Sequence, residues 1–293
     1  MIAAVTARAF EASAELAPAD VEVRRLPEGR DDAAFVMPDW EDRETIEALP
    51  RLERLRVVQA LSAGTEWIEP RVPPWATLCN ARGTRDAAVA EWVVGALLGD
   101  AYGQFTAART RRWSDAVPHE LQGRHVLIVG FGSIGEAARR RLEPFGVTVT
   151  GVARHGRPGV HPVTELPELL GQADAVVVLA PLTPETRGLI DAALLARMRD
   201  GALLVNAGRG RVVDTDALLA ELRSGRLRAV LDVVDPEPLP DDHSLWDVAL
   251  AITPHNAGDT PAADERAVRF GAEQLVRFAR GEPLENVVRQ ARR

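Results

Sequence analysis

A glycine-rich turn between an apolar run and a helix-forming stretch constrains this chain more than any other feature. Residues 125–129 read His-Val-Leu-Ile-Val, the hexapeptide Gly-Phe-Gly-Ser-Ile-Gly follows at once, and residues 136–142 have a helical composition. In such a unit Gly130 makes the tight turn, Gly132 lets a pyrophosphate approach the backbone, and Gly135 allows close packing of helix on strand. The pyrophosphate would rest on amide groups near Ser133 and Ile134, because a helix N-terminus favours an anion. The turn therefore predicts a dinucleotide site, and a purely structural turn is the alternative.

Alternation of apolar runs with helical stretches predicts an α/β fold on both sides of this turn. Around it, the predicted strands are residues 125–129, 147–153, 175–180, 203–207, 228–234 and 250–253. Their near-continuous Val, Ile and Leu content is typical of strands covered on both faces. In the first hundred residues the predicted strands are 2–5, 21–26, 33–37, 56–61 and 77–80. The pattern predicts two Rossmann-like or flavodoxin-like doubly wound parallel-sheet domains with a cleft between them.

Two long helical stretches, residues 86–110 and 262–280, are the expected connections between these domains. We expect a substrate-binding domain from residues 1–99, completed by residues 259–293, and a dinucleotide-binding Rossmann domain from residues 100–258.

Composition excludes several other kinds of chemistry. All 35 cationic side chains are arginine, so mechanisms that need a lysine Schiff base, lysine-bound pyridoxal phosphate or a GxxxxGK[ST] loop are excluded. Cys79 is the only cysteine, which excludes an internal disulfide and a multi-cysteine metal site, and we predict no metal. The net charge of −8 argues against nucleic acid as a partner. Without a transmembrane-length apolar run or a signal-peptide pattern, we expect a cytoplasmic protein with no membrane contact.

The end of the second strand in the dinucleotide domain bears on which cofactor is bound. An acidic residue there would bind the adenosine ribose 2′-hydroxyl and repel a 2′-phosphate. This chain has Ala153 at that point, followed by Arg154 and Arg157. Because a guanidinium can donate two parallel hydrogen bonds to a phosphate, we predict NADP(H) over NAD(H). If both arginines are solvated loop residues, NAD(H) would be used with weak discrimination.

Three polar side chains follow the last three strands of the same domain. Arg209, Glu237 and His255 each come shortly after a predicted strand. Ligands bind at the carboxyl ends of strands in open α/β sheets, so the three side chains are predicted to meet.

With these motifs the sequence resembles the D-isomer-specific 2-hydroxyacid dehydrogenases, including glyoxylate/hydroxypyruvate reductase-like and phosphoglycerate dehydrogenase-like members. The likeness covers nearly the whole chain. Besides the glycine turn, the matching stretches are residues 61–65, 80–83, 89–91, 181–186, 198–213, 232–240, Trp246 and residues 253–255.

The resemblance implies NAD(P)-dependent reduction of a 2-keto acid to the D-2-hydroxy acid, or the reverse. His255 would be the general acid or base, Glu237 would orient its ring, and Arg209 would bind the carboxylate and polarise the ketone. Asp232 would bind the nicotinamide carboxamide. Backbone amides of Ser62, Ala63 and Gly64 would hold the substrate carboxylate from the other domain. The remaining implied cofactor contacts are Pro181, Thr186, Ala207, Ala257 and Gly258.

Partner and alternative functions follow from the same resemblance. Family members are usually dimers through the nucleotide domain, so a homodimer is expected, with Trp113 a candidate contact. A non-catalytic dinucleotide sensor on the same fold is the main alternative, although the complete Arg-Glu-His set favours catalysis. Formate dehydrogenases share the architecture but match less closely, and related phosphite and alanine dehydrogenases use a substrate lysine. The particular hydroxy acid and the physiological direction are left open.

Overall fold

The computed structural model describes residues 1–111, 113 and 117–292, and the chain divides into two compact units. The first unit comprises Met1–Arg85 and Asp259–Arg293, and the second comprises Asp86–Gly258. The boundary therefore lies before helix α3 (Asp86–Ala101), not after residue 99 as the sequence-based prediction had it. The reason is packing, because Val93 and Leu97 of α3 share a core with Ala138 of helix α5 (Ser133–Leu142).

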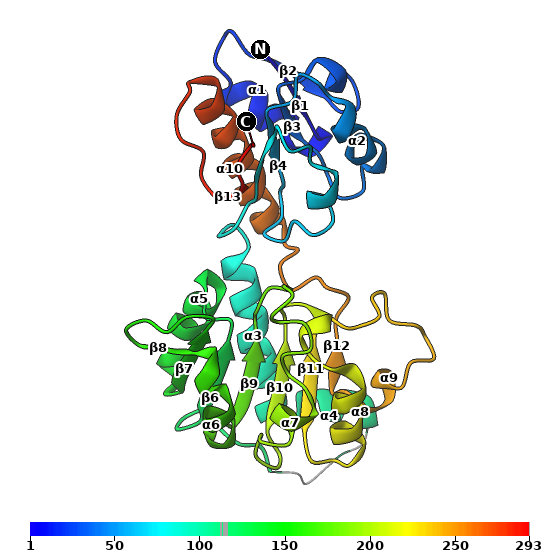
Figure 1. The fold of residues 1–293 in the computed structure, drawn as a ribbon. Helices are drawn as coiled ribbons and strands as arrows, with labels where there is room; N and C mark the ends of the chain where they lie inside the picture. Colours follow the sequence, from blue (N-terminus) through cyan, green and yellow to red (C-terminus); the bar gives the residue numbers. More distant parts are fainter. Residues whose placement is uncertain (112, 114–116, 293) are drawn as a thin grey trace. The chain divides into compact units, whose positions relative to one another are not determined.

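The first unit is a six-stranded sheet with helices on its faces (Figure 1). Its strands are β1 (Ile2–Val5), β2 (Glu22–Arg25), β3 (Phe35–Met37), β4 (Val57–Gln59), β5 (Thr77–Cys79) and β13 (Val287–Arg289). Its helices are α1 (Phe10–Leu16), α2 (Arg43–Ala48) and α10 (Pro261–Ala279). The strand order β2-β1-β3-β4-β5-β13 begins with the flavodoxin-like pattern, and β13 pairs antiparallel with β5.

The second unit is a seven-stranded parallel sheet of Rossmann type (Figure 1). Its strands are β6 (His125–Val129), β7 (Thr148–Ala153), β8 (Val160–Pro162), β9 (Ala175–Val178), β10 (Leu203–Asn206), β11 (Arg228–Leu231) and β12 (Ala251–Ile252). Besides α3 and α5, its helices are α4 (Gln104–Thr110), α6 (Leu166–Leu169), α7 (Ala192–Leu195), α8 (Thr215–Arg223) and α9 (Leu245–Val248). The spatial order is β8-β7-β6-β9-β10-β11-β12, so the direction of winding reverses between β6 and β9. Ligands bind at the carboxyl ends of strands beside such a switch point.

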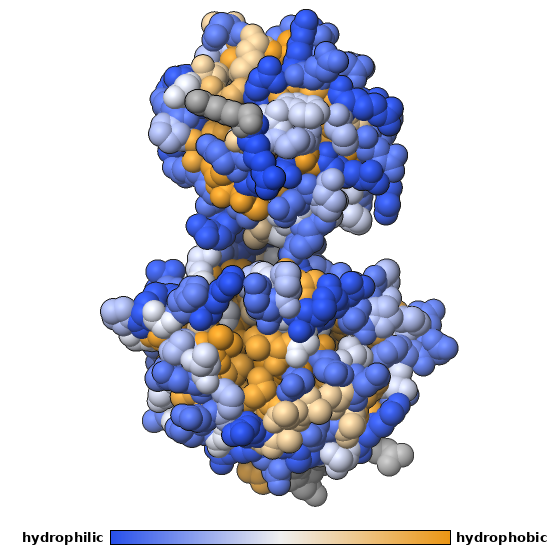
Figure 2. Space-filling model, viewed as in Figure 1, coloured by the Kyte–Doolittle hydropathy of each residue, from blue (hydrophilic) through white to orange (hydrophobic). Residues whose placement is uncertain are grey.

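Both faces of this sheet are buried, which explains its apolar strands. Along β6, Val126 and Ile128 belong to one hydrophobic core, while Leu127 and Val129 belong to the other. Successive side chains of a strand point to opposite faces, so each strand contributes to two layers. In Figure 2, hydrophobic residues reach the surface in the central area of this unit. The connection between β9 and β10 contains one short α-helix, α7.

The predicted α/β fold class is confirmed, with differences in individual elements. The stretch predicted as one helix, residues 86–110, is divided into α3 and α4 because Gly103 adopts a left-handed φ of +65°. The short strands β8 and β13 were missed. Both strands lie at sheet edges and have only three residues, which is too short for an alternating apolar pattern to be recognised. In addition, β8 ends in Pro162, a residue that interrupts strand patterns.

Candidate active site

The glycine turn lies where the sequence predicts, between β6 and α5. Gly130 has φ +97°, and a Cβ there would lie 2.3 Å from the backbone nitrogen of Ala180. Gly132 differs, because a Cβ at this position would meet no heavy atom within 4 Å. It is the N-cap of α5 and offers no side-chain hydrogen bond, so the first amide groups of the helix, at Ser133, Ile134 and Gly135, are not capped from within. The turn therefore combines open space with uncapped donors, which suits a pyrophosphate.

The two arginines after β7 lie near this turn in different ways. Arg157 donates a 2.6 Å hydrogen bond from Nη2 to the carbonyl oxygen of Phe131, within the glycine turn itself. Arg154 has a side chain that is 68% exposed and contacts Glu185 at 3.5 Å. A partner held this loosely at the surface contributes little binding energy, so Arg154 can turn to another anion.

Backbone hydrogen bonds align the carboxyl ends of the last three strands. The amide of Asp232, after β11, donates to the carbonyl of Asn206 at the end of β10 over 2.8 Å. The amide of His255, after β12, donates in turn to the carbonyl of Asp232 over 2.8 Å. This ladder brings the three loops together at one edge of the sheet.

His255 and Glu237 form a directly hydrogen-bonded pair at this edge. His255 Nδ1 lies 2.7 Å from Glu237 Oε1, and both side chains are about 40% exposed, at 43% and 42%. The hydrogen bond to Glu237 raises the pKa of His255 above its ordinary value, against burial and the positive charge of Arg209. The same bond lowers the pKa of Glu237, which also accepts a hydrogen bond from the backbone of Val234. The pair therefore favours a protonated imidazole beside a carboxylate.

His255 has a backbone conformation that is uncommon for a residue with a side chain. Its φ is +54°, in the left-handed region. Such a conformation costs roughly 1–3 kcal/mol and persists only where surrounding contacts impose it. Here the contacts come from Asp232, which is 3% exposed. Its carboxylate accepts hydrogen bonds from the amides of Asn256 and Ala257 at 3.0 and 3.1 Å, and from the Thr253 hydroxyl at 2.5 Å.

Arg209 lies on the loop after β10, and two neighbours fix its backbone. Asn206, 1% exposed, donates from Nδ2 to the Arg209 carbonyl at 3.2 Å and accepts from the Gly208 amide at 3.1 Å. A Cβ on Gly210 would lie 1.9 Å from the carbonyl oxygen of Val234, so the loops after β10 and β11 touch through their backbones. The charge of Arg209 acts on both Glu237 and His255, which places the three predicted catalytic side chains in one electrostatic cluster.

Other predicted cofactor residues lie on loops at the same edge. Pro181 and Thr186 lie on the loop after β9, where the Thr186 hydroxyl donates to the Pro181 carbonyl at 2.6 Å. The Ala207 amide donates to the carbonyl of Val178 at 3.1 Å. Gly258 ends the second unit.

The predicted substrate loop, residues 62–64, belongs to the first unit. The Ser62 hydroxyl donates to the Gly64 carbonyl at 2.6 Å and accepts from the indole Nε1 of Trp67 at 3.1 Å. Asn80 donates from Nδ2 to the Ala63 carbonyl at 2.7 Å. The loop is thus rigidly held, and its approach to Arg209 in the other unit stays a prediction.

The sequence analysis did not predict three groups that position the candidate catalytic side chains. The side chain of Asn206, the Thr253 hydroxyl and the backbone of Val234 all support the Arg209, Glu237 and His255 cluster. Asn206 and Thr253 have a signal, since each is a polar residue at the end of an apolar strand. A backbone donor has no sequence signal.

The described part of the chain contains neither a cluster of metal-ligating side chains nor a membrane-spanning helix. Among residues 1–111, 113 and 117–292, no group of three or more His, Cys, Asp or Glu side chains is placed to hold a metal ion. No helix within these residues is long and apolar enough to cross a membrane.

Comparisons with known proteins found a matching family model and several relatives. The model for the NAD binding domain of the D-isomer specific 2-hydroxyacid dehydrogenase family matches residues 97–257. A glyoxylate reductase from Thermofilum pendens is 32% identical over 287 residues, covering 90% of this chain and 83% of that protein.

Two solved structures are similar over almost their full length. An NADPH-dependent glyoxylate/hydroxypyruvate reductase from Sinorhizobium meliloti, in complex with NADP and sulfate, is 30% identical with a TM-score of 0.83, covering 98% of each chain. A D-isomer specific 2-hydroxyacid dehydrogenase from Xanthobacter autotrophicus, in complex with NADPH and MES, is 30% identical with a TM-score of 0.84, covering 98% of this chain and 97% of that one.

Proposed function

The chain belongs to the D-isomer specific 2-hydroxyacid dehydrogenase family, and from this premise we propose that it reduces a small 2-keto acid to the D-2-hydroxy acid with NADPH. The observation that carries the proposal is the cluster of Arg209, Glu237 and His255 at the sheet edge that also holds the glycine turn. A general acid, its orienting carboxylate and a fixed cation are the groups that carbonyl reduction requires.

His255 would supply the proton to the carbonyl oxygen. Its Nδ1 is engaged by Glu237 at 2.7 Å, so Nε2 is the ring nitrogen left for the substrate. Glu237 raises the pKa of His255, which favours the protonated ring that reduction needs. In the direction of oxidation the same nitrogen, once deprotonated, would accept the hydroxyl proton.

Arg209 would bind the substrate carboxylate and polarise the ketone. A guanidinium presents a planar set of donors suited to a carboxylate, and it stabilises the negative charge that develops on the carbonyl oxygen. The buried Asn206 fixes the backbone from which this side chain projects. The rigid loop of residues 62–64 would contribute backbone amides to the same carboxylate.

A nicotinamide dinucleotide, when bound, supplies the hydride. The residues present fit such a cofactor, because Gly132 faces open space and α5 begins with uncapped amides. Asp232 accepts hydrogen bonds from Thr253, Asn256 and Ala257, chiefly through Oδ1, and so helps to hold His255 in place. Any contact of Asp232 with the carboxamide would be additional to these bonds.

NADP(H) is favoured by the arginines after β7. Arg154 is exposed and Arg157 is anchored on the glycine turn through Phe131, so both can meet a ribose 2′-phosphate. The related enzyme from Sinorhizobium meliloti is described as NADPH-dependent. NAD(H) would then be the weaker cofactor.

The protein would act as a homodimer formed through its nucleotide domain. Trp113 and Val117, in the connection before β6, have 98% and 90% of their surfaces exposed within one chain. Large apolar side chains this exposed suit burial against a second copy. Sedimentation velocity at micromolar concentration should give about twice the mass of one chain, and a purely monomeric profile would contradict the dimer.

The proposed reaction is tested by following NADPH oxidation with glyoxylate, hydroxypyruvate and bulkier 2-keto acids. Wild type should turn over at least one of them, and His255→Ala should lose roughly 10²- to 10⁴-fold in kcat while binding NADPH nearly as well. No turnover across the panel, with NADPH still bound, would favour a dinucleotide sensor instead.

A further inference from the structure

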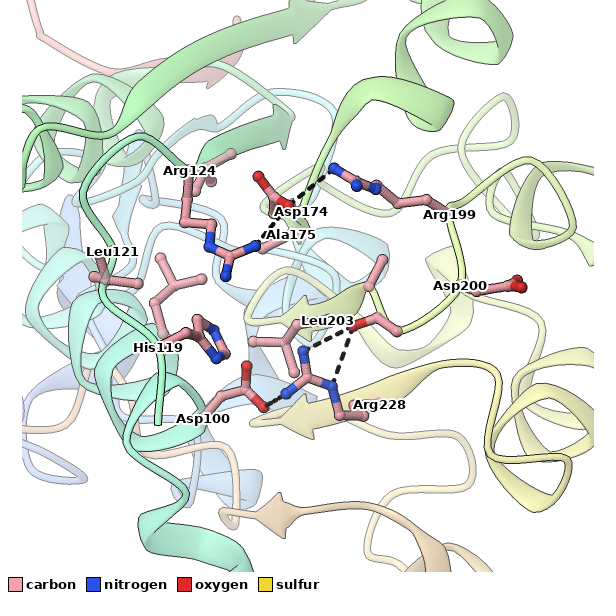
Figure 3. Close-up of a pocket in the computed structure, with 14 residues that line it drawn as sticks. Asp100, His119, Leu121, Arg124, Asp174, Ala175, Arg199, Asp200, Leu203 and Arg228 are labelled. Carbon is pink, nitrogen blue, oxygen red and sulfur yellow. Dashed lines mark hydrogen bonds and ion pairs between the residues drawn. The ribbon is translucent and has the colours of Figure 1, made fainter. Parts of the chain in front are cut away.

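A second candidate site lies at the opposite edge of the same sheet. A cavity of about 240 Å³ opens at the amino ends of the central strands of the second unit (Figure 3). Arg124 and Asp174 directly precede β6 and β9, and Arg228 begins β11. The glycine turn and His255 follow the carboxyl ends of these strands, so this cavity is separate from the proposed active site.

Three arginines and three aspartates line this cavity, and two of the aspartates are ion-paired with the arginines. Arg124 and Arg199 both donate through Nη1 to the same oxygen, Oδ1 of Asp174, at 3.2 and 2.9 Å (Figure 3). Arg228 pairs with the buried carboxylate of Asp100. Three guanidinium groups thus share two carboxylates, while the third carboxylate of the lining, that of Asp200, is 88% exposed.

Two of these arginines keep donors available for a ligand. Among the residues that the structure describes, Arg124 and Arg199 each make a single side-chain hydrogen bond, through one Nη. A guanidinium carries five N–H groups, so the others can reach a second acceptor. Their side chains are 41% and 52% exposed, which leaves them accessible from solvent.

The remaining lining consists of an exposed carboxylate, a histidine and apolar side chains. Asp200 also lines it, but its carboxylate is 88% exposed and contacts Arg226 at 3.6 Å. Burial and the charges of Arg124 and Arg228 lower the pKa of His119 on the wall, so its ring is neutral near pH 7 and can donate one hydrogen bond. Apolar side chains, among them Leu97 and Leu121, form another part of the wall.

We propose that this cavity binds a small oxyanion, a phosphate or a polycarboxylate, held chiefly by Arg124 and Arg199. Its volume is below the roughly 300–1,000 Å³ typical of drug-sized ligands, so the occupant is small. Planar guanidinium donors bind phosphate and carboxylate groups by the same charge-assisted hydrogen bonds. The proposal does not depend on the dehydrogenase activity.

Isothermal titration of the full chain with sodium phosphate, and separately with sodium citrate, at constant ionic strength tests the site. Wild type should bind at least one of them saturably. Arg199→Gln should weaken binding roughly tenfold or more, because a charge-assisted donor is lost. Since its ion pair is exposed, this variant should fold normally. Asp174→Asn should strengthen binding, because it removes the carboxylate that competes for both arginines.

Arg54→Gln is the matched control, because it removes one exposed, ion-paired arginine of the first unit, outside both proposed sites, and should bind the anion as wild type does. Which salt binds identifies the ligand as phosphate or polycarboxylate, and either result supports the site. The proposal fails if wild type binds neither salt, if Arg199→Gln binds unchanged, or if Arg54→Gln loses as much affinity as Arg199→Gln.

Discussion

Alanine substitution at two glycines of the same turn should affect different properties, stability at Gly130 and cofactor affinity at Gly132. In Gly130→Ala the new Cβ would lie 2.3 Å from the Ala180 nitrogen, at a backbone φ of +97°. Backbone strain of roughly 1–3 kcal/mol and overpacking of roughly 1–3 kcal/mol together predict a loss of about 2–6 kcal/mol in unfolding free energy. In Gly132→Ala the φ is −95° and no heavy atom lies within 4 Å, so stability should change by no more than about 0.5 kcal/mol.

The second substitution should instead impair cofactor binding. A methyl group at Gly132 occupies the space through which a pyrophosphate would approach the α5 amides. We expect NADPH affinity to fall at least roughly tenfold, equivalent to about 1.4 kcal/mol. Urea unfolding followed by circular dichroism measures the first effect, and NADPH fluorescence titration measures the second. If Gly132→Ala bound NADPH as wild type does, or lost as much stability as Gly130→Ala, the assignment of this turn would be wrong.

Four further predictions concern single side chains. Glu237→Gln removes the carboxylate that raises the pKa of His255. Because reduction needs the protonated ring, kcat/KM for reduction should begin to fall at a lower pH than in wild type as the pH is increased. Coincident pH profiles of the two proteins would contradict the pairing. Arg154→Asp should lower the ratio of kcat/KM for NADPH to that for NADH by roughly tenfold or more, and an unchanged ratio would leave Arg154 without a role in cofactor choice. Asp232→Asn should reduce kcat more than NADPH affinity, with about 1–3 kcal/mol lost in stability, whereas a loss confined to NADPH affinity would show a mainly cofactor-binding role. Burial raises the pKa of Cys79 to about 11, so iodoacetamide should not label the native protein at pH 8 by mass spectrometry, although it should label the urea-unfolded chain.

The fold was predictable where the physical cause was local to one strand. Strands buried on both faces must be apolar throughout, so the positions of β6, β9 and β10 could be predicted from composition alone. Edge strands have no such requirement, and of the four edge strands β2 and β12 were predicted whereas β8 and β13 were missed. The domain boundary could not be predicted from sequence either, because α3 packs on α5 through contacts between residues distant in sequence.

The candidate site was predictable because topology gathers polar residues at strand ends. The rule that ligands bind at the carboxyl ends of parallel strands predicted that the loops bearing Arg209, Glu237 and His255 would lie together. It could not predict the supports of these side chains. The hydrogen bonds of Asp232 to the backbone amides after Pro254 depend on a turn conformation with no distinctive residue, and the requirement for Gly210 arises only when two loops touch.

The charges around His255 connect substrate binding to proton supply. Glu237 raises the pKa of the imidazole, whereas the positive charge of Arg209 lowers it. If Arg209 holds the substrate carboxylate, as proposed, the bound anion offsets that positive charge and removes most of its effect on the ring. The pKa of His255 should then be higher in the substrate complex than in the free enzyme, because one of the two effects that oppose Glu237, the charge of Arg209, is offset while burial remains. Binding of a keto acid would thus increase the protonation of His255, the residue that donates the proton to it. Binding of a hydroxy acid would raise the pKa of His255 in the same way, although oxidation needs the neutral ring.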